Sequence, residues 1–410
     1  MSSSTSSTPG FRNVIVVGAG PSGLLMALLL GKSGIPVTLL DMSPELDKSP
    51  RATHYGSPAM YEFNRAGVGD EIRARGFQPN GVAWRKMDGT PIASIHNTVL
   101  GEDPLRMTVL PLSDLGRLLR EHIGKHKNVE VLFGHKVVGL GQDDGQAWVE
   151  VETSEGPKTM RADYIVGCDG ANSQIRRSLF GDAEFPGRTW DQQIVATNTY
   201  YDFDQFGWTD SSFIVHPEHY FMAAKIQNDG LWRVTYGETP GLTPEQMRER
   251  QPWKFKTMLP GHPDPSQYRI VNFSPYKIHQ RLAKSMRVGR FLLAADAAHL
   301  CNPFGGLGLT GGLVDVGNLY DCLVGMYENK ADPSILDKYN EIRRQKYLEV
   351  IDVVSSSNIR RLFETDPERA LEVDPFFQVI KKAETDKDLS RELQHATNSI
   401  MHDFTQYYKS

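Results

Sequence analysis

The sequence has few cysteines, no excess of basic residues and no uninterrupted apolar run of membrane-spanning length. Its 410 residues include three cysteines, Cys168, Cys301 and Cys322. A small and odd number of cysteines argues against a disulfide framework and favours a reducing compartment. The formal net charge of -5 offers no basic surface for nucleic acid. These absences leave small molecules as the expected partners and predict a cytoplasmic protein.

The most apolar stretch, residues 14–40, is interrupted by glycines, a lysine and a proline. These interruptions divide it into strand, turn, helix, turn and strand, so we predict no integral membrane segment. Residues 1–10, MSSSTSSTPG, have neither the basic segment nor the apolar segment of a secretory signal. We expect them to form a disordered leader.

The pattern of apolar residues predicts an α/β domain that a second domain interrupts. Buried strands and helices alternate up to about residue 180, whereas residues 190–236 are rich in aromatic residues and alternate with the period of an antiparallel sheet. Residues 239–268 are rich in proline and charge, and a long helix is expected from Pro333 to about Glu364. The predicted segments are a leader at 1–10, the first part of the α/β domain at 11–185, an inserted domain at 186–284, a return segment at 285–330 and a helical C-terminal region at 331–410.

The first chemical motif is the glycine-rich segment Gly18-Ala19-Gly20-Pro21-Ser22-Gly23, between a predicted strand and a predicted helix. Glycines let a pyrophosphate approach the backbone amides at the start of a helix. Asp41 ends the next strand, where a carboxylate can accept hydrogen bonds from a ribose. The motif therefore favours dinucleotide binding, and the alternative is a tight structural turn with a capping aspartate.

The second motif is a buried strand that ends in Cys168-Asp169-Gly170 and is followed by Arg176 and Arg177. A carboxylate at the carboxyl end of such a strand lies where α/β proteins bind their ligands. An ordinary Asp-Gly turn with two solvated arginines explains the pattern equally well.

The third motif runs from Gly289 to His299 and continues through Pro303 to a cluster of glycines ending at Gly312. The glycines lead into a helical stretch, so they predict a helix N-terminus whose exposed amides suit an anion. His299 and Cys301 lie within this motif but lack the spacing of metal ligands, and we predict no metal site.

Together and in this order, the three motifs resemble those of the single-component FAD-dependent aromatic hydroxylases, the family of para-hydroxybenzoate and phenol hydroxylase, including fungal enzymes of polyketide metabolism. The resemblance covers about residues 11–350. It implies a three-layer Rossmann-like FAD-binding domain, an inserted antiparallel-sheet substrate domain and a helical C-terminal region. It also implies that NADPH or NADH reduces FAD and that O2 then forms a flavin C4a-hydroperoxide, which hydroxylates an aromatic substrate. The resemblance places such an enzyme in secondary metabolism.

The resemblance assigns cofactor contacts to residues of all three motifs. Gly18, Gly20 and Gly23 would hold the FAD pyrophosphate, and Asp41 the adenosine ribose. Arg51 would reach the flavin, and Asp169 with Gly170 would serve both FAD and the visiting nicotinamide. Asp296 would bind the ribityl chain. The loop around the flavin ring would comprise Pro303, Gly305, Gly306, Gly308 and Leu309. Leu307 and Thr310 stand where the family commonly has Gln and Asn.

The catalytic candidates are polar residues expected near the flavin ring. His54 follows the second predicted strand and could accept the proton of a substrate phenol. His216, Arg233 and Tyr236 lie in the aromatic-rich segment and could anchor a phenolate or a carboxylate. The alternative for each is a structural residue of the core or of a sheet face.

The reaction outcome stays open at this stage. Dearomatising or decarboxylative hydroxylation, Baeyer-Villiger insertion and epoxidation use the same cofactor, and the bound substrate decides among them. A flavin halogenase is disfavoured because the sequence has no Trp-x-Trp-x-x-Pro segment. A non-catalytic FAD-bound sensor is the alternative from another class of protein. Nothing in the sequence indicates the oligomeric state.

Overall fold

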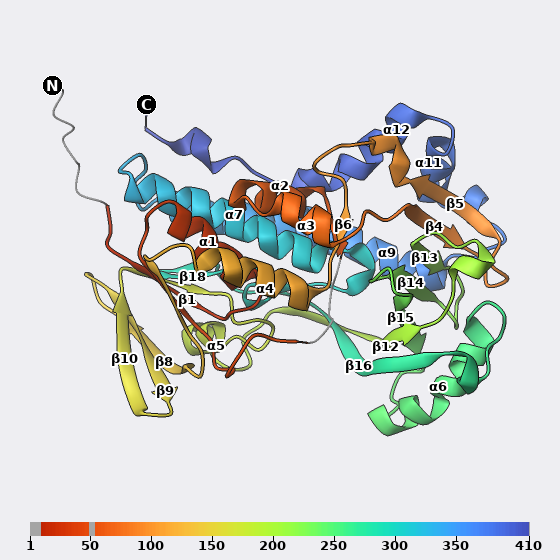
Figure 1. The fold of residues 1–410 in the computed structure, drawn as a ribbon, viewed down its shortest axis with the longest axis horizontal. Coiled ribbons are helices and arrows are strands. Elements are labelled where there is room, and N and C mark those ends of the chain that lie inside the picture. The colour runs from red at the N-terminus through yellow and green to blue at the C-terminus, as the bar shows by residue number, and fades with distance from the viewer. Residues whose placement is uncertain (1–9, 49–53, 410) are drawn as a thin grey trace.

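The computed structural model describes residues 10–48 and 54–409, in which two large sheets lie side by side along the long axis of the molecule (Figure 1). The first sheet has six strands in the order β17-β18-β11-β1-β2-β7. Its strands are β1 (Val14–Val17), β2 (Val37–Leu40), β7 (Val129–Leu132), β11 (Tyr164–Gly167), β17 (Arg287–Val288) and β18 (Phe291–Leu293). Every pair in it is parallel except β17 with β18.

Two layers cover this parallel sheet. Helices α1 (Pro21–Lys32), α4 (Leu112–Ile123) and α7 (Leu307–Tyr327) lie on one face (Figure 1). A three-stranded antiparallel sheet of β8 (Lys136–Gln142), β9 (Ala147–Thr153) and β10 (Gly156–Ala162) lies on the other. Helix α7 is buried along most of its length, as a helix that is apolar all round must be. The predicted three-layer Rossmann-like domain is therefore present.

The second sheet has eight strands in the order β19-β16-β12-β15-β14-β13-β4-β5. They are β4 (Gly81–Arg85), β5 (Pro91–His96), β12 (Gly187–Tyr200), β13 (Ser211–Ile214), β14 (Phe221–Lys225), β15 (Leu231–Glu238), β16 (Arg269–Leu282) and β19 (His299–Leu300). All neighbours are antiparallel except β13 with β4. Strands β4 and β5 come from the segment assigned to the FAD-binding part, yet they pair here.

Two segments contain elements that their sequence patterns did not specify. Residues 129–151 alternate in the manner of antiparallel strands, but β7 joins the parallel sheet beside β2. The segment 239–268, rich in proline and charge, contains helix α6 (Pro244–Met258). That helix begins at a capping box in which Thr243 and Gln246 satisfy each other's backbone amides, a signal present in the sequence.

The C-terminal region begins with one long helix in three parts. Helix α8 (Ile335–Lys346) passes through a π-helical turn, Tyr347–Ile351, into α9 (Asp352–Glu364), which confirms the expected helix. The helices that follow are α10 (Ala370–Val373), α11 (Pro375–Ala383) and α12 (Lys387–His395). Although this region is rich in charged residues, α11 buries Phe377 and Ile380 in the core of the second sheet.

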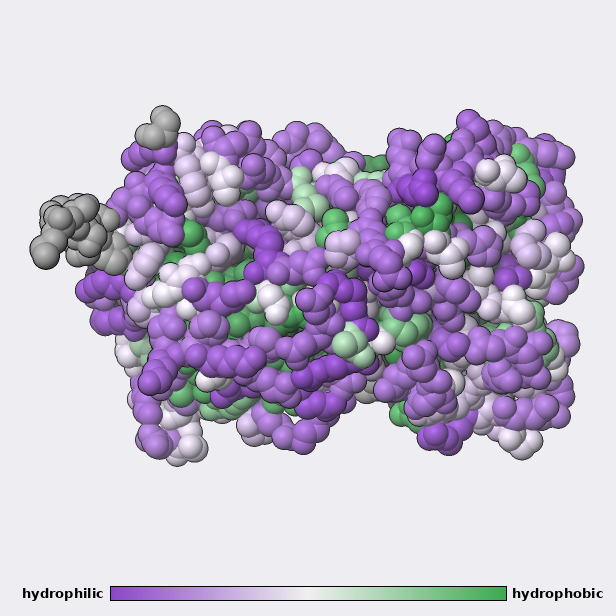
Figure 2. Space-filling model, turned by 45° about the horizontal axis from the view of Figure 1, so that its top comes forward, coloured by the Kyte–Doolittle hydropathy of each residue, from purple (hydrophilic) through white to green (hydrophobic). Residues whose placement is uncertain are grey.

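The remaining elements are short. They are β3 (His54–Tyr55), which pairs with β6 (Thr108–Val109), and the helices α2 (Ser57–Ala66), α3 (Gly69–Arg75) and α5 (Gln174–Phe180). Figure 2 shows a mostly hydrophilic face on which hydrophobic residues are visible chiefly where the surface is hollowed. Within the part of the chain that the structure describes, no helix is long and apolar enough to cross a membrane.

A buried ionic cluster ties α7 and α8 to the loop after β18. The two carboxylate oxygens of Asp315 accept hydrogen bonds from Arg343 Nε, at 2.7 Å, and from His299 Nε2, also at 2.7 Å. Asp315 also accepts from the backbone amide of Ala295, at 2.9 Å. Burial by itself raises the pKa of Asp315, but His299 and Arg343 outweigh it and hold this pKa below its ordinary value. The cluster therefore depends on the ionised carboxylate.

We expect Asp315→Asn to lower the free energy of unfolding by about 3 to 5 kcal/mol, because Arg343 would remain buried without its charge partner. Because the folded-state pKa is lowered, the contribution of Asp315 is complete above its unfolded-state pKa and is lost as the pH falls through the folded-state value. Urea unfolding at neutral and acidic pH measures both effects. Asp70→Asn, which removes a carboxylate 99% exposed, is the control and should cost less than about 0.5 kcal/mol.

Candidate functional site

A cavity of about 900 Å³ lies where the two sheets meet, and all three sequence motifs line it. The first contributes Gly20 and its neighbours, the second Gly170 and the third Asp296. The loop residues predicted to surround the flavin also line it: Pro303, Gly305, Gly306, Gly308 and Leu309. Segments from three distant parts of the chain thus share one cavity, as a large extended ligand requires.

The three glycines of the first motif have different tasks. Gly18 has a φ of 103°, and a Cβ there would lie 2.4 Å from the carbonyl oxygen of Cys168. A Cβ at Gly23 would lie 1.8 Å from the carbonyl oxygen of Gly18. A Cβ at Gly20 would meet no atom within 4 Å, and Gly20 lines the cavity. Gly18 and Gly23 therefore shape the turn, whereas Gly20 leaves room for a ligand at the start of α1.

Asp41 and Asp169 do not line the cavity. Their carboxylates accept hydrogen bonds that stabilise the turns of the first and second motifs, and these turns line it. Asp41 accepts from the backbone amide of Ala19, which lines the cavity, at 2.6 Å. Asp169 accepts from Ser173 Oγ at 2.5 Å and from the amide of Ile175 at 3.1 Å. Burial raises the pKa of Asp169, and these hydrogen bonds oppose the rise. Arg51, the other predicted contact from this half, lies outside the described residues.

Asp296 is placed by a strained backbone and by the ionic cluster behind it. Ala295 has a φ of 58°, unusual for a residue with a side chain, and its amide donates to Asp315. This conformation directs the next residue, Asp296, into the cavity. Desolvation of the carboxylate there raises the pKa of Asp296. Hydroxyl donors from a ligand would therefore stabilise its charged form.

The glycine cluster after Asp296 is more rigid than a loop. Leu307 begins α7, so Gly308, Gly311 and Gly312 belong to the first turns of that helix. A Cβ at Gly312 would lie 2.5 Å from the Cβ of Ala295. The glycines therefore permit close packing of α7 beneath the cavity and expose the amides at its N-terminus.

His54 and Arg233, two of the four catalytic candidates, line the same cavity. Burial lowers the pKa of His54 to about 4, and the positive charge of Arg233 acts in the same direction. Asn198 orients Arg233 because its Oδ1 accepts from Nε at 3.0 Å and from Nη2 at 2.8 Å. The site therefore combines an imidazole that is neutral at pH 7 with a fixed guanidinium.

The other two candidates, His216 and Tyr236, do not reach the cavity. His216 lies in the turn between β13 and β14, where its Nδ1 accepts from the amides of Glu218, at 3.1 Å, and His219, at 2.9 Å. Tyr236 lies three residues from Arg233 on β15 and therefore points to the opposite face of the sheet. There it packs against Phe255 of α6. Neither residue lines the cavity, and both make contacts elsewhere in the second sheet.

Sequence reasoning missed the residues that close the far end of the cavity. They come from β4, β13 and the C-terminal helices: Val82, Trp84, Phe213, Phe376, Ile380, Leu393 and Gln394. The sequence Pro375-Phe376-Phe377-Gln378-Val379-Ile380 carried a signal, because its apolar residues recur with the period of an amphipathic helix. Such a face has to be buried against another element.

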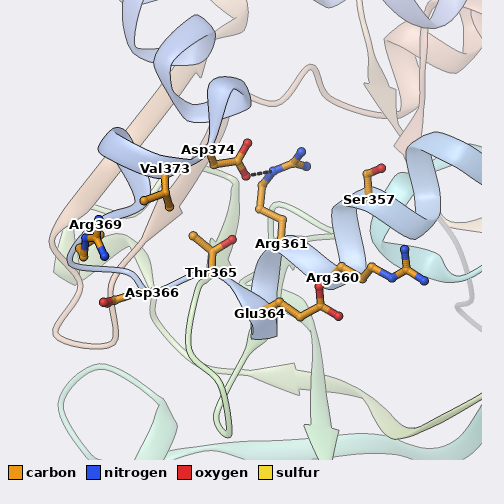
Figure 3. A pocket seen from close by; sticks show the side chains of 9 residues that line it. All are labelled: Ser357, Arg360, Arg361, Glu364, Thr365, Asp366, Arg369, Val373 and Asp374. Atoms are coloured by element: carbon orange, nitrogen blue, oxygen red, sulfur yellow. Dashed lines mark hydrogen bonds and ion pairs between the residues drawn. The ribbon is translucent and has the colours of Figure 1, made fainter.

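A smaller hollow of about 480 Å³ lies at the end of α9 (Figure 3). Its lining is open and charged, and Arg361 Nε is paired with Asp374 at 2.7 Å. None of the three motifs contributes to it. Among the described residues no cluster of three or more His, Cys, Asp or Glu side chains has the geometry of a metal site. The larger cavity is therefore the candidate site.

Comparison with known proteins agrees with this site. A family model described as an FAD binding domain matches residues 12–354. A para-nitrophenol 4-monooxygenase from a Pseudomonas species is 37% identical over 381 residues, 92% of this chain and 93% of the relative. A 6-hydroxy-3-succinoylpyridine 3-monooxygenase from Pseudomonas putida is 37% identical over 358 residues, 87% of this chain and 90% of the relative.

Solved structures show the same fold. The crystal structure of a p-nitrophenol 4-monooxygenase from Pseudomonas putida superposes with a TM-score of 0.88 at 36% identity and covers 95% of this chain and 98% of that one. A flavin-dependent monooxygenase solved with FAD and substrate has a TM-score of 0.75 at 22% identity, covering 98% of this chain and 73% of that one. The second likeness supports the fold alone.

The contrast between Gly20 and Gly23 gives a prediction about ligand binding. We expect Gly23→Ala to lower the free energy of unfolding by about 1 to 3 kcal/mol or more, because its Cβ would overlap backbone. Gly20→Ala should change that free energy by less than about 0.5 kcal/mol but weaken FAD binding about tenfold or more, because its methyl group enters the cavity. Urea unfolding of the apoproteins and FAD titration measure the two effects. An unchanged FAD affinity in Gly20→Ala would remove this turn from the site.

Proposed function

The chain belongs to the FAD-binding-domain family of flavin-dependent aromatic monooxygenases, and from this premise we propose that it uses NADPH or NADH and O2 to hydroxylate a phenolic small molecule. One observation carries the proposal: the three nucleotide-type motifs line a cavity that also holds a neutral histidine and an arginine. The motifs suit FAD, and the histidine with the arginine suits an aromatic ring with an ionisable hydroxyl.

We assign the cofactor contacts from the geometry of the turns. Gly20 and the amides at the start of α1 would hold the pyrophosphate, and Asp296 the ribityl hydroxyls. Gly170 and the run from Pro303 to Leu309 would border the flavin ring. The contacts predicted for Asp41 with the ribose and for Asp169 with the nicotinamide stay predictions. FAD, once reduced by NAD(P)H, would activate O2 so that one of its oxygen atoms can be transferred to the substrate, and the protein would supply binding and orientation.

His54 and Arg233 act on the substrate in this proposal. Because its pKa is about 4, His54 is neutral at pH 7 and has a ring nitrogen that can receive a proton. A phenolate forming beside it would raise this pKa by its negative charge, so that the histidine could hold the phenolic proton. Arg233, held by Asn198, would then stabilise the phenolate oxygen with its positive charge. A phenolate is more electron-rich than a phenol, so removal of the proton activates the ring toward an electrophilic oxygen donor.

The relatives support the substrate class. Their names specify a nitrophenol and a hydroxypyridine, both of which are aromatic rings that carry a hydroxyl group. The finer predictions of a fungal polyketide-type subfamily and of secondary metabolism stay predictions, since these relatives are bacterial enzymes.

The decisive experiment is product analysis. The FAD-loaded protein is incubated with NADH or NADPH, O2 and a panel of phenols, and the products are identified by mass spectrometry. We expect at least one phenol to gain 16 mass units, with consumption of NAD(P)H. Oxidation of NAD(P)H to peroxide with every phenol, and no oxygenated product, would contradict the proposal.

We expect His54→Ala to slow hydroxylation about a hundredfold to ten-thousandfold, the usual effect of losing a general base. Flavin reduction by NAD(P)H should change much less, because the histidine acts on the substrate. In the wild-type protein, kcat/KM should show no inflection near pH 6.5 from this group, since its pKa is about 4. Stopped-flow measurements of the two half-reactions separate these effects.

His216→Ala is the matched control for this experiment, because that ring caps a backbone turn away from the cavity. Its effect on reduction and on hydroxylation should be equal. A wild-type product yield per NAD(P)H in His54→Ala would show that His54 is structural.

A further inference from the structure

The floor of the cavity is a row of side chains that crosses five strands of the second sheet. Arg233 on β15 faces Ala224 on β14, which faces Ser211 on β13. Ser211 in turn faces Val82 on β4, and Val82 faces Ile95 on β5. Directly paired residues point to the same face of a sheet, and all five line the cavity. Four strand spacings of about 4.8 Å make this row about 19 Å long.

The row changes from charged to apolar along its length. Arg233 stands at one end, near His54, whose pKa it lowers. The side chains of Ala224 and Ser211 are short, so the cavity is deep over the middle of the row. Val82 and Ile95 form an apolar far end, and a neighbouring row on the same face, which includes Trp84, adds further apolar surface.

The C-terminal helices cover the apolar end of the row. Phe376 of α11 contacts Trp84 edge to face, with ring centroids 5.0 Å apart, and Ile380 lines the cavity one turn further along. Helix α12 contributes Leu393 and is attached to the segment after β5, because Arg391 Nε donates to the carbonyl oxygen of Val99 at 3.3 Å. Figure 1 shows α11 and α12 beside β4 and β5. The sheet and these two helices thus enclose an apolar slot.

We propose that this slot binds an apolar extension of the substrate, so that the preferred substrate is a phenol bearing an alkyl chain or a second ring. The proposal rests on the proposed function, which places the phenolic hydroxyl at His54 and Arg233. A phenol of one ring at that position would leave the apolar half of the row uncovered. An extension opposite the hydroxyl would lie over Ala224 and Ser211 and end against Ile95, Ile380 and Leu393.

A series of 4-alkylphenols tests the slot. Binding to the FAD-loaded protein is measured by titration calorimetry without NAD(P)H, and kcat/KM is measured separately. We expect affinity to rise about fourfold for each methylene group until the slot is filled, and then to stop rising. Affinity that is constant or falls beyond the methyl compound would overturn the proposal.

Two neighbouring residues of α11 provide a variant and its control. Ile380 is 3% exposed and lines the slot, whereas Val379 is 41% exposed and faces away from it. Ile380→Trp should reduce the ratio of long-chain to short-chain affinity at least tenfold, and Val379→Trp should preserve the wild-type ratio. Equal ratios in the two variants would show that α11 does not limit the slot.

If Ile380→Trp does not fold, Ser211→Leu fills the middle of the row from the sheet side and should lower the same ratio. The two readouts separate this proposal from the proposed function. Chain-length dependence of binding without any oxygenated product would retain the slot and refute the monooxygenase. Oxygenated products with no chain-length dependence of binding would support the monooxygenase and refute the slot.

Discussion

The parallel pairing of β1, β11 and β18 is the constraint on which the site depends. Val17, Gly167 and Leu293 lie side by side in register, so the chain leaves all three strands at the same edge of the sheet. Each strand is followed at once by one of the motifs, and the three turns are therefore brought together although more than a hundred residues separate them in sequence. No side-chain contact could replace this arrangement, because it is the backbone ladder that fixes where each turn begins.

The charged groups on the two sides of the cavity are arranged differently. Behind it, Asp315 is paired with Arg343 and hydrogen-bonded to His299, and the cluster fixes the backbone from which Asp296 projects. In front of it, Arg233 lies near a histidine whose pKa is lowered by burial and, to a smaller extent, by the charge of Arg233. The first arrangement gives rigidity because both oxygens of the buried carboxylate accept hydrogen bonds from fixed donors. The second leaves an imidazole and a guanidinium exposed to the space where a ligand would lie.

The sequence predicted the elements and cofactor motifs that depend on local pattern. The βαβ unit, the long C-terminal helix and the glycine-rich turns follow from periodicity and from residues suited to close backbone approach. Strand pairing was not predictable in the same way: nothing local indicates that β4 and β5 leave the first domain's segment to pair with β13. The direction of side chains was also hidden. Arg233 and Tyr236 were equally good candidates until the sheet showed that β15 turns one to the cavity and the other to α6.

The π-helical turn Tyr347–Ile351 accommodates one residue more than an α-helical turn of the same rise would. Each residue rotates a helix by about 100°, so this insertion sets the orientation of α9 independently of α8. Before the turn, the helix presents Arg343 to Asp315; after it, the helix presents Asn358 and Leu362 to the cavity. Deleting a single residue here would leave the ionic cluster intact and swing a wall of the cavity through more than a quarter of a revolution. The π-helical turn thus allows one helix to place Arg343 against Asp315 and also to place Asn358 and Leu362 at the cavity.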